Sequence, residues 1–466
     1  MSQADLSDFV RVRAEELGMP GVAVGVATDG RKTFTSHGVT SVENPLAVDH
    51  NTLFHFGSIT KTFTATALMC LVASCDVDLG APVRRYLPEF RVKDERVADT
   101  VTVLQLVNHT SGWDGLIVDT GEGDDALAGY VARMAGLGQL FPVGSSASYN
   151  NAAFTLAGRV IEKVTGKTYE KAVGSLLLGP LGLTRTFFSA NEAITRRAAV
   201  GHHGNPDGSV SVTRPWRGTR NGNPMGGVTS TVADQLTWAL FHLADGCDSA
   251  GKRILPRELA ALMRQPSAEL FGSALGDAVG IGWFLRDVDG VRTVGHGGSM
   301  NSQFAQLLMV PERDFAVVAA ANGAPDGNRF TKDVVRWVLD AELGLAARDP
   351  EPLAFDEGRA SAVEGTYESS AAWVTVTSSG RELTLEFGVK PEANVALSEV
   401  VFDYPPFTLG LLPGRGDRYI LMSGAFTGTR GCFRRDETGA VVGVDFIGRL
   451  YRRVGSLSVG RGRVVE

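Results

Sequence analysis

Ser58 and Lys61 lie three residues apart in the segment HFGSITKT (55–62), which leads into the apolar run FTATALMCLVAS. A helix beginning here would place both side chains on one face, because residues at i and i+3 are neighbours on a helix. A lysine whose pKa is lowered by burial or nearby cations could then accept the serine's proton and activate it as a nucleophile. The other interpretation is a capping serine beside a surface lysine, which is the commoner origin of so short a pattern.

Two further segments carry polar side chains beside predicted elements. Tyr149, Asn150 and Asn151 precede the predicted helix AAFTLAGRVIEKVTG, where asparagine is a preferred cap and a tyrosine usually packs. The segment VGHGGS (294–299) ends a predicted strand, and its glycines would let a ligand or another backbone approach closely. The alternative for this segment is a β-bulge or tight hairpin with an incidental histidine.

The composition argues against several classes of function. The 466 residues include 45 basic and 52 acidic side chains and carry a formal net charge of −7, so nucleic acid is not expected as a partner. Four cysteines without C-x-x-C spacing and eight histidines without an H-E-x-x-H pattern predict neither a zinc site nor a disulfide framework. Cys70 and Cys75 are expected on different faces of one helix. We expect no metal and no cofactor.

The sequence also predicts a cytoplasmic protein that does not contact membranes. No apolar run reaches the roughly 18 residues that a membrane helix needs. The N-terminal residues include early acids and lack a basic region followed by an apolar one, which is the signature of a secretory leader.

The candidate residues must be brought together by elements that are distant in the sequence. Residues 3–18 have helical apolar spacing, and a strand, a turn at Asp29-Gly30 and a second strand follow. Helices are expected through 58–190 and over 231–245. Strand patterns return at 280–286, 291–295, 303–310 and 314–321, before a helix over 328–344. This order predicts an α+β unit, an antiparallel sheet flanked by helices with a helical region inserted.

The pattern of apolar and turn residues changes after Asp349-Pro350. Residues 363–455 show short alternating runs separated by turn residues, and no helix pattern stands out there. We therefore expect two domains, 1–349 and 350–466, of which the second is an all-β antiparallel barrel.

The motifs in this order resemble those of the penicillin-recognising serine hydrolases: Ser-x-x-Lys at 58–61, Tyr-x-Asn at 149–151 and His-x-Gly at 296–298. This superfamily includes class C β-lactamases, DD-peptidases, D-aminopeptidases and β-lactamase-like esterases. The resemblance covers about residues 1–345 and implies a β-lactamase/DD-peptidase-like fold. The C-terminal unit resembles the lipocalin-like barrels appended to some D-aminopeptidases and penicillin-binding-protein-type peptide cyclases.

The resemblance implies a role for each motif residue. Ser58 would be the nucleophile, Lys61 would share its proton, and Tyr149 would relay a proton to the leaving group. His296 stands where many relatives carry lysine, and we expect it to hydrogen-bond Tyr149. The expected catalytic residues are thus Ser58, Lys61, Tyr149 and His296, and the expected substrate-binding residues are Asn151, Gly297, Gly298 and Ser299.

Finer assignments follow from the same resemblance. Asn151 would bind the substrate's amide, the backbone N–H groups of Ser58 and Ser299 would form the oxyanion hole, and the two glycines would let the strand approach the substrate. His296 in place of lysine is typical of the esterase and D-aminopeptidase branches, which disfavours β-lactamase activity. Whether Lys61 or Tyr149 is the acylation base is left open.

The sequence therefore predicts a serine hydrolase that forms an acyl-enzyme at Ser58 and cleaves esters or amides of small acyl or peptide substrates, including D-amino acid ones. One alternative is an acyl transferase or peptide cyclase that passes the acyl group to an amine. Another is a non-catalytic ligand-binding protein on the same fold. The barrel would either cap the active site or serve stability or assembly, and the oligomeric state is left open.

Two loops are candidates for substrate specificity. Residues 115–130 carry Glu122, Asp124 and Asp125 and could attract an amine. Residues 202–224 could hold a carboxylate or an aromatic group through the side chains Arg214, Trp216, Arg217 and Arg220. Solvated surface loops are the default interpretation of both.

Overall fold

The computed structural model describes residues 1–115, 118–205, 207–216, 218–390, 404–414, 416–424 and 426–454. The chain divides into two compact units. The first contains Met1–Glu269 and Gly276–Arg348, and the second contains Leu270–Leu275 and the described residues from Asp349 onward. Each unit is considered separately below.

The first unit is built on an antiparallel sheet whose strands follow the order β2-β1-β12-β11-β10-β9-β8. β1 pairs with β12, with Val24 opposite Ala319, so the two ends of this unit meet as predicted. The strands are β1 (Gly21–Thr28), β2 (Arg31–Gly38), β8 (Gly276–Val279), β9 (Phe284–Val288), β10 (Val291–Met300), β11 (Gln303–Val310) and β12 (Phe315–Ala321).

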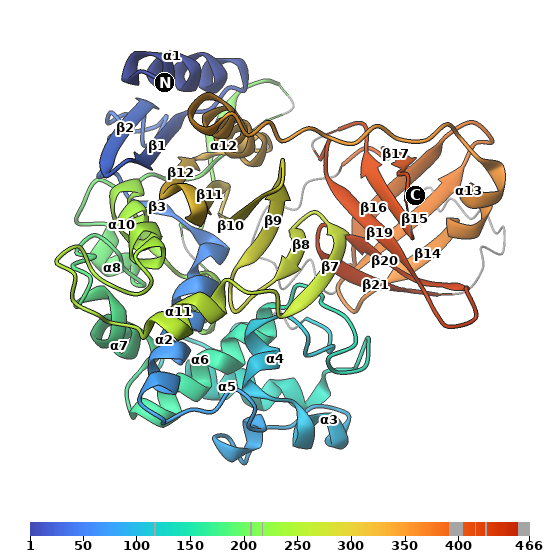
Figure 1. Cartoon of the computed structure of the whole chain (residues 1–466), viewed down its shortest axis with the longest axis horizontal. Helices are drawn as coiled ribbons and strands as arrows, with labels where there is room; N and C mark the ends of the chain where they lie inside the picture. Colours follow the sequence, from blue (N-terminus) through green and yellow to red (C-terminus); the bar gives the residue numbers. More distant parts are fainter. Residues whose placement is uncertain are drawn as a thin grey trace. The chain divides into compact units, whose positions relative to one another are not determined.

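Helices cover both faces of this sheet (Figure 1). The side chains of β1 alternate between the faces, as the two-residue period of a strand requires. On one face Val24 packs in a cluster with residues of α1 (Gln3–Glu16) and α12 (Gly327–Leu343). On the other face Ala23 belongs to the cluster that contains Trp238 of α10 (Val232–Leu243). The predicted α+β class is confirmed.

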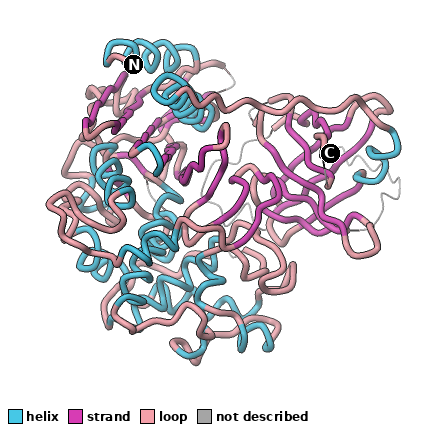
Figure 2. The backbone as a smooth tube through the Cα atoms, in the orientation of Figure 1, coloured by secondary structure: helices cyan, strands magenta, loops and turns pink. Residues whose placement is uncertain are grey.

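A helical region adjoins this second face, and Figure 2 shows its helices as a cyan group beside the magenta strands. Its central helix, α2, is buried nearly all round, including its threonines. These threonines are tolerated because their hydroxyls donate to backbone oxygens; Thr62 donates to Ile59 and Thr66 to Thr62, each at 2.7 Å. The helices are α2 (Thr60–Ala73), α3 (Glu95–Thr100), α4 (Val103–Val107), α5 (Ala126–Arg133), α6 (Asn151–Thr165), α7 (Tyr169–Val173), α8 (Ala190–Ala193), α9 (Asn223–Gly226) and α11 (Arg257–Met263).

Short strands hold the segments around α2. β3 (Phe54–His55) pairs with β6 (Thr229–Ser230), which fixes the chain just before Ser58. A small three-stranded sheet has the order β13-β4-β5, formed by β13 (Gly323–Ala324), β4 (His202–Gly204) and β5 (Val210–Val212).

The second unit contains a closed eight-stranded antiparallel barrel, as predicted for the C-terminal unit. Its interior is apolar and includes Val374, Leu385 and Phe407. The strands are β14 (Gly365–Glu368), β15 (Ala372–Ser378), β16 (Leu383–Val389), β17 (Phe407–Leu411), β18 (Asp417–Leu421), β19 (Arg430–Arg435), β20 (Val441–Phe446) and β21 (Arg449–Arg453). Residues 391–403, 415, 425 and 455–466, which fall in the predicted barrel domain, lie outside the described residues.

Some local structure was not predicted from the sequence. The strands β7 (Ala268–Ser273) and β8 and the helix α13 (Glu357–Val363) carry patterns too short to be recognised. The strand predicted to end at residue 295 continues to Met300, through glycines that lower strand propensity. Cys75 lies outside α2, because the helix ends at Ala73 and Cys75 has a φ of +64°.

Candidate active site

Ser58 and Lys61 meet where a 3₁₀ turn, η1 (Gly57–Ile59), continues into α2. Lys61 is fully buried. Its Nζ donates to Ser58 Oγ at 3.1 Å and to the carbonyl oxygen of Met225 at 2.6 Å. The interpretation of Lys61 as a surface lysine is therefore wrong, and the amine is positioned where it can exchange a proton with the serine hydroxyl.

Two glycines bring β10 against the backbone of the nucleophile. Gly57 has a φ of +49°, and a Cβ built there would lie 2.6 Å from the nitrogen of Ser299. A Cβ at Gly298 would lie 1.9 Å from the carbonyl oxygen of Phe56 and 3.0 Å from the nitrogen of Ser58. Only residues without a side chain fit this approach. The amides of Ser58 and Ser299 consequently lie on adjoining backbones.

The edge of β10 beside the nucleophile has no strand partner in the described structure. β10 pairs with β11 from Val294 to Met300, but its pairing with β9 stops at Gly295. The stretch from His296 onward is therefore left beside η1 rather than beside another strand. An unpaired edge of this kind offers backbone donors and acceptors to a ligand.

Tyr149 lies against the lysine, immediately before α6. Lys61 Nζ is 4.7 Å from the centroid of the Tyr149 ring, within the roughly 6 Å over which a cation is attracted to an aromatic face. The ring centroids of His109 and His296 lie 4.7 Å and 6.3 Å from that of Tyr149. The structure thus brings the tyrosine, the lysine and His296 into one cluster.

Asn150 fixes the start of α6 as its N-cap residue. Its side-chain oxygen accepts from the backbone N–H of the third helical residue, and its Nδ2 donates to the carbonyl of Trp113 at 2.8 Å. Its own N–H donates to His109 Nδ1 at 3.1 Å. These bonds hold the backbone between Tyr149 and Asn151.

Asn151 Oδ1 is buried and has no hydrogen-bond partner among the described residues.

His296 is buried and neutral. Its Nδ1 lies 2.6 Å from the carbonyl oxygen of Gly297, which places the ring hydrogen on Nδ1. Burial, and secondarily the charge of Lys61, lower the pKa of His296 to about 3, against the opposing effect of the Gly297 bond. Nε2 has no hydrogen-bond partner within the described part of the chain, so it does not form the predicted bond to Tyr149. It remains an acceptor inside the site.

The two candidate specificity loops are bonded to each other. Arg220 donates to the carbonyl oxygen of Glu122 at 2.6 Å and to the carboxylate of Asp124 at 2.8 Å. Asn221 donates to the carbonyl of Val118 at 3.0 Å, from the same loop to the same partner loop. Arg220 and Asp124 are therefore engaged with each other rather than with solvent alone.

The other three candidate residues of the second loop are Arg214, Trp216 and Arg217. Arg214 is paired with Glu43, at 2.7 Å between Nη2 and the carboxylate. Trp216 donates through Nε1 to the carbonyl of Ala199 at 3.0 Å. Arg217 lies outside the described residues. Arg214 and Arg220 are thus both paired with carboxylates of this chain.

Glu170, which the sequence analysis did not single out, connects the loop that carries Arg220 to Lys61. Its carboxylate accepts from Arg220 and, at 2.7 Å, from Nδ2 of Asn223, the first residue of α9. The same short helix carries the Met225 carbonyl that holds Lys61. Burial acts to raise the pKa of Glu170, but the bonds from Arg220 and Asn223 outweigh it, and the net shift is downward. Glu170 is therefore an ionised anchor.

The described residues contain no cluster of three His, Cys, Asp or Glu side chains able to hold a metal ion. The cysteines at 70, 75, 247 and 432 are all free. Within the described ranges, no helix is both long enough and apolar enough to cross a lipid bilayer.

Sequence comparison shows which known proteins this chain resembles. The family model described as Beta-lactamase matches residues 6–356. The chain belongs to the Beta-lactamase family. This Beta-lactamase family protein is 35% identical over 359 residues to penicillin-binding protein 4 of Amycolatopsis lactamdurans, covering 75% of this chain and 93% of that one. It is 26% identical over 375 residues to Unguisins hydrolase ungD of Aspergillus violaceofuscus, covering 73% of this chain and 65% of that one.

Among solved structures, the crystal structure of SurE with D-Leu superposes with a TM-score of 0.74 at 25% identity. The match covers 97% of this chain and 99% of SurE, so it includes both units. The relatives support a serine hydrolase or acyltransferase role for this chain.

Proposed function

We propose that this protein is a serine hydrolase that forms an acyl-enzyme at Ser58 and cleaves ester or amide bonds of small acyl or peptide substrates. The observation that carries the proposal is the buried Lys61 amine, 3.1 Å from the Ser58 hydroxyl and held from behind by the Met225 carbonyl. A serine paired with a positioned base is the arrangement that nucleophilic catalysis requires.

In the proposed reaction, Ser58 Oγ attacks the substrate carbonyl carbon while its proton passes to Lys61 or Tyr149. The carbonyl oxygen becomes an oxyanion between the N–H groups of Ser58 and Ser299. As the tetrahedral intermediate collapses, the bond to the leaving alcohol or amine breaks and the leaving group takes up the proton. Water then attacks the acyl-enzyme, releasing the acid and returning the proton to Ser58. His296 Nε2 supplies a neutral acceptor beside these groups.

The comparison with SurE motivates a substrate that contains a D-amino acid, because that protein was solved with D-Leu. One relative is named as a hydrolase of unguisins, which supports hydrolysis as the reaction. His296 in place of lysine continues to favour ester and amide substrates over β-lactams.

Transfer of the acyl group to an amine is the second candidate. The acyl-enzyme is the same, and the bond to Ser58 is broken by an amine instead of water. The likeness to SurE favours this candidate, because a free D-amino acid such as the one in that structure carries an amine.

A panel of p-nitrophenyl esters, D-amino amides and peptidyl thioesters, each assayed with and without an added amine, separates these reactions. Free acid as the product supports hydrolysis, and an amide that appears only with the amine supports transfer. Absence of turnover and of acylation with every substrate would contradict both.

A further inference from the structure

The helix α9 is a single turn, and its end lies against α2. It stops at Gly226, so the carbonyl of Pro224 has no partner in a following turn. In a longer helix the N–H of Val228, four residues on, would donate to that carbonyl. Instead, Thr64 Oγ1 donates to the Pro224 carbonyl at 2.6 Å. The N–H of Val228 donates to Thr60 Oγ1 at 2.9 Å. Two threonines of α2 therefore terminate α9.

The carbonyl that holds the lysine lies between these two bonds. Met225 is the third residue of α9, and its carbonyl is also left without a partner within the helix. It accepts from Lys61 Nζ at 2.6 Å. The side chains of Thr60, Lys61 and Thr64 come from one stretch of α2, and all three are fully buried. The position of the lysine amine beside the nucleophile thus depends on where α9 ends.

A second hydroxyl extends this arrangement. Thr64 Oγ1 lies 2.7 Å from the hydroxyl oxygen of Tyr169, the first residue of α7. A threonine hydroxyl has one hydrogen and the Pro224 carbonyl can only accept, so the hydrogen of Thr64 lies on its bond to Pro224. The hydrogen between the two hydroxyls consequently belongs to Tyr169. Hydrogen bonds run in one direction from Tyr169 through Thr64 to α9, and bonds linked in this way strengthen one another in a protein interior.

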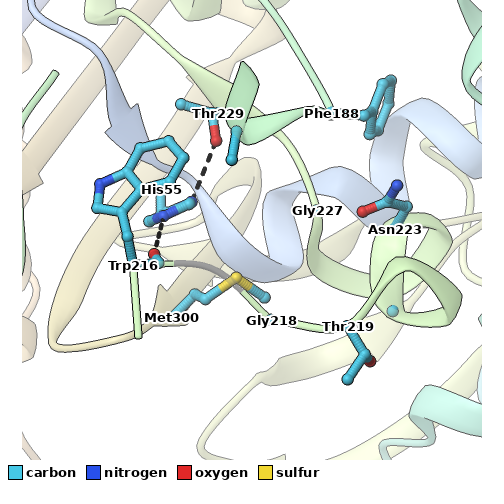
Figure 3. Close-up of a pocket in the computed structure, with 11 residues that line it drawn as sticks. His55, Phe188, Trp216, Gly218, Thr219, Asn223, Gly227, Thr229 and Met300 are labelled. Atoms are coloured by element: carbon cyan, nitrogen blue, oxygen red, sulfur yellow. Dashed lines mark hydrogen bonds between the residues drawn. The ribbon is translucent and has the colours of Figure 1, made fainter. Parts of the chain in front are cut away.

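Tyr169 is a fixed donor. Its side chain is fully buried, and burial raises the pKa of its hydroxyl, which therefore keeps its hydrogen. Its backbone N–H donates to the carboxylate of Glu162 at 3.2 Å, and its ring meets that of Phe188 edge to face, with centroids 5.3 Å apart. Figure 3 shows Phe188 and Asn223, the first residue of α9, on one side of the small hollow that both line. The chain of bonds thus starts from a tyrosine that is held in place.

We propose that Tyr169 and Thr64 are positioning residues for the acylation step. Their linked hydroxyls fix the end of α9, where the Met225 carbonyl orients the Lys61 amine. This rests on the acyl-enzyme function proposed above, and it differs from the anchor at Glu170, which holds the first residue of α9. Neither hydroxyl is accessible to a substrate, because both side chains are fully buried. Their removal should therefore change the rate of acylation and not the binding of substrate.

The test measures these two quantities separately, by stopped-flow reaction of the whole protein with p-nitrophenyl butyrate over a range of concentrations. Tyr169→Phe should lower the acylation rate constant about fivefold, the usual effect of one lost hydrogen bond, and leave the substrate Kd unchanged. Thr64→Val keeps the shape of the side chain but removes both bonds. It should lower the rate constant about tenfold or more, because a small displacement of a catalytic group is costly.

Three further variants separate positioning from general stability. Thr64→Ser keeps the hydroxyl and should restore most of the wild-type rate. Thr66→Val removes an equally buried hydroxyl of α2, which donates to the carbonyl of Thr62 and not to α9, and should leave acylation unchanged. The double variant Tyr169→Phe/Thr64→Val should be no slower than Thr64→Val, since residues that act through one chain are not additive.

An unchanged acylation rate constant in Tyr169→Phe would overturn the proposal, and so would equal losses in Thr64→Val and Thr66→Val. If Thr64→Val fails to fold, Tyr169→Phe decides the question alone, because it removes a single oxygen and keeps the ring packing. Failure of the proposed function has a different signature: the wild type would then react neither with p-nitrophenyl butyrate nor with a fluorophosphonate.

Discussion

The two units both bury ionisable side chains, but these groups have different surroundings. In the first unit Lys61 and His296 lie around one serine. In the barrel Asp445 is fully buried, and its carboxylate accepts from the N–H of Gly448 at 3.0 Å, which closes the turn between β20 and β21. Burial raises the pKa of Asp445 to about 7. A single buried ionisable group therefore does not indicate catalysis, whereas convergence of several such groups on a nucleophile does.

The largest effect is expected when the lysine of the first unit is removed. Lys61→Ala should lower the rate of Ser58 acylation about a thousandfold, because proton transfer by a positioned group contributes about 10²–10⁴. Stopped-flow acylation by an activated ester measures it. Lys163→Ala, an exposed lysine on α6, is the matched control. A loss of less than tenfold would show that Lys61 is structural, as Asp445 is.

Tyr149→Phe should reduce turnover about a hundredfold while the protein still folds, because the ring packing is retained and only the hydroxyl is lost. Steady-state hydrolysis of p-nitrophenyl butyrate checks this, with Tyr86→Phe as a control for loss of a tyrosine hydroxyl. Near-normal turnover would remove Tyr149 from the proposed mechanism.

Glu170→Gln should slow acylation about tenfold, because it weakens the anchor of α9 and displaces the carbonyl that holds Lys61. The pH profile of acylation should shift as well, since the surroundings of the lysine change. Glu43→Gln removes a surface ion pair with Arg214 and should affect neither quantity. Unchanged kinetics in both variants would limit Glu170 to a structural role.

The smallest catalytic effect is expected in the barrel. The pKa of Asp445 is raised in the folded state, so its contribution to stability is present below the unfolded pKa of about 3.9 and is lost as the pH rises toward 7. Asp445→Asn should abolish this loss, which amounts to roughly 1.4 kcal/mol per pH unit. Acylation of Ser58 should not change.

Melting temperatures at pH 4.5 and 7.5 measure this difference, with Glu437→Gln as an exposed control. The expected result is a variant that gains stability relative to the wild type at the higher pH. An unchanged pH dependence would mean that Asp445 is ionised in the folded barrel, contrary to its burial.

Sequence patterns predicted the features that depend on local residue spacing and on the alternation of apolar residues along strands. The alternation after residue 350 was sufficient for the barrel, and the three-residue spacing of Ser58 and Lys61 was sufficient to place them on one helical turn. The contact between Gly298 and Phe56 was predicted only as a generic close approach, since no local pattern says which backbone comes near.

The residues that sequence reasoning missed act through distant partners. Glu170 holds Asn223, which is 53 residues away in the sequence. A buried histidine or a glutamate on a short helix has no local signature that distinguishes it from a packed or solvated residue. The hydrogen bond of His296 was also missed, because its Nδ1 bonds to the carbonyl oxygen of the next residue, Gly297, and not to Tyr149.

The central claim is that Ser58 is the nucleophile, and intact-mass analysis after treatment with a fluorophosphonate tests it most directly. The account predicts one added phosphonyl group on the wild type, located at Ser58 by peptide mapping, and none on Ser58→Ala. An unmodified wild type, or equal modification of both proteins, would contradict it.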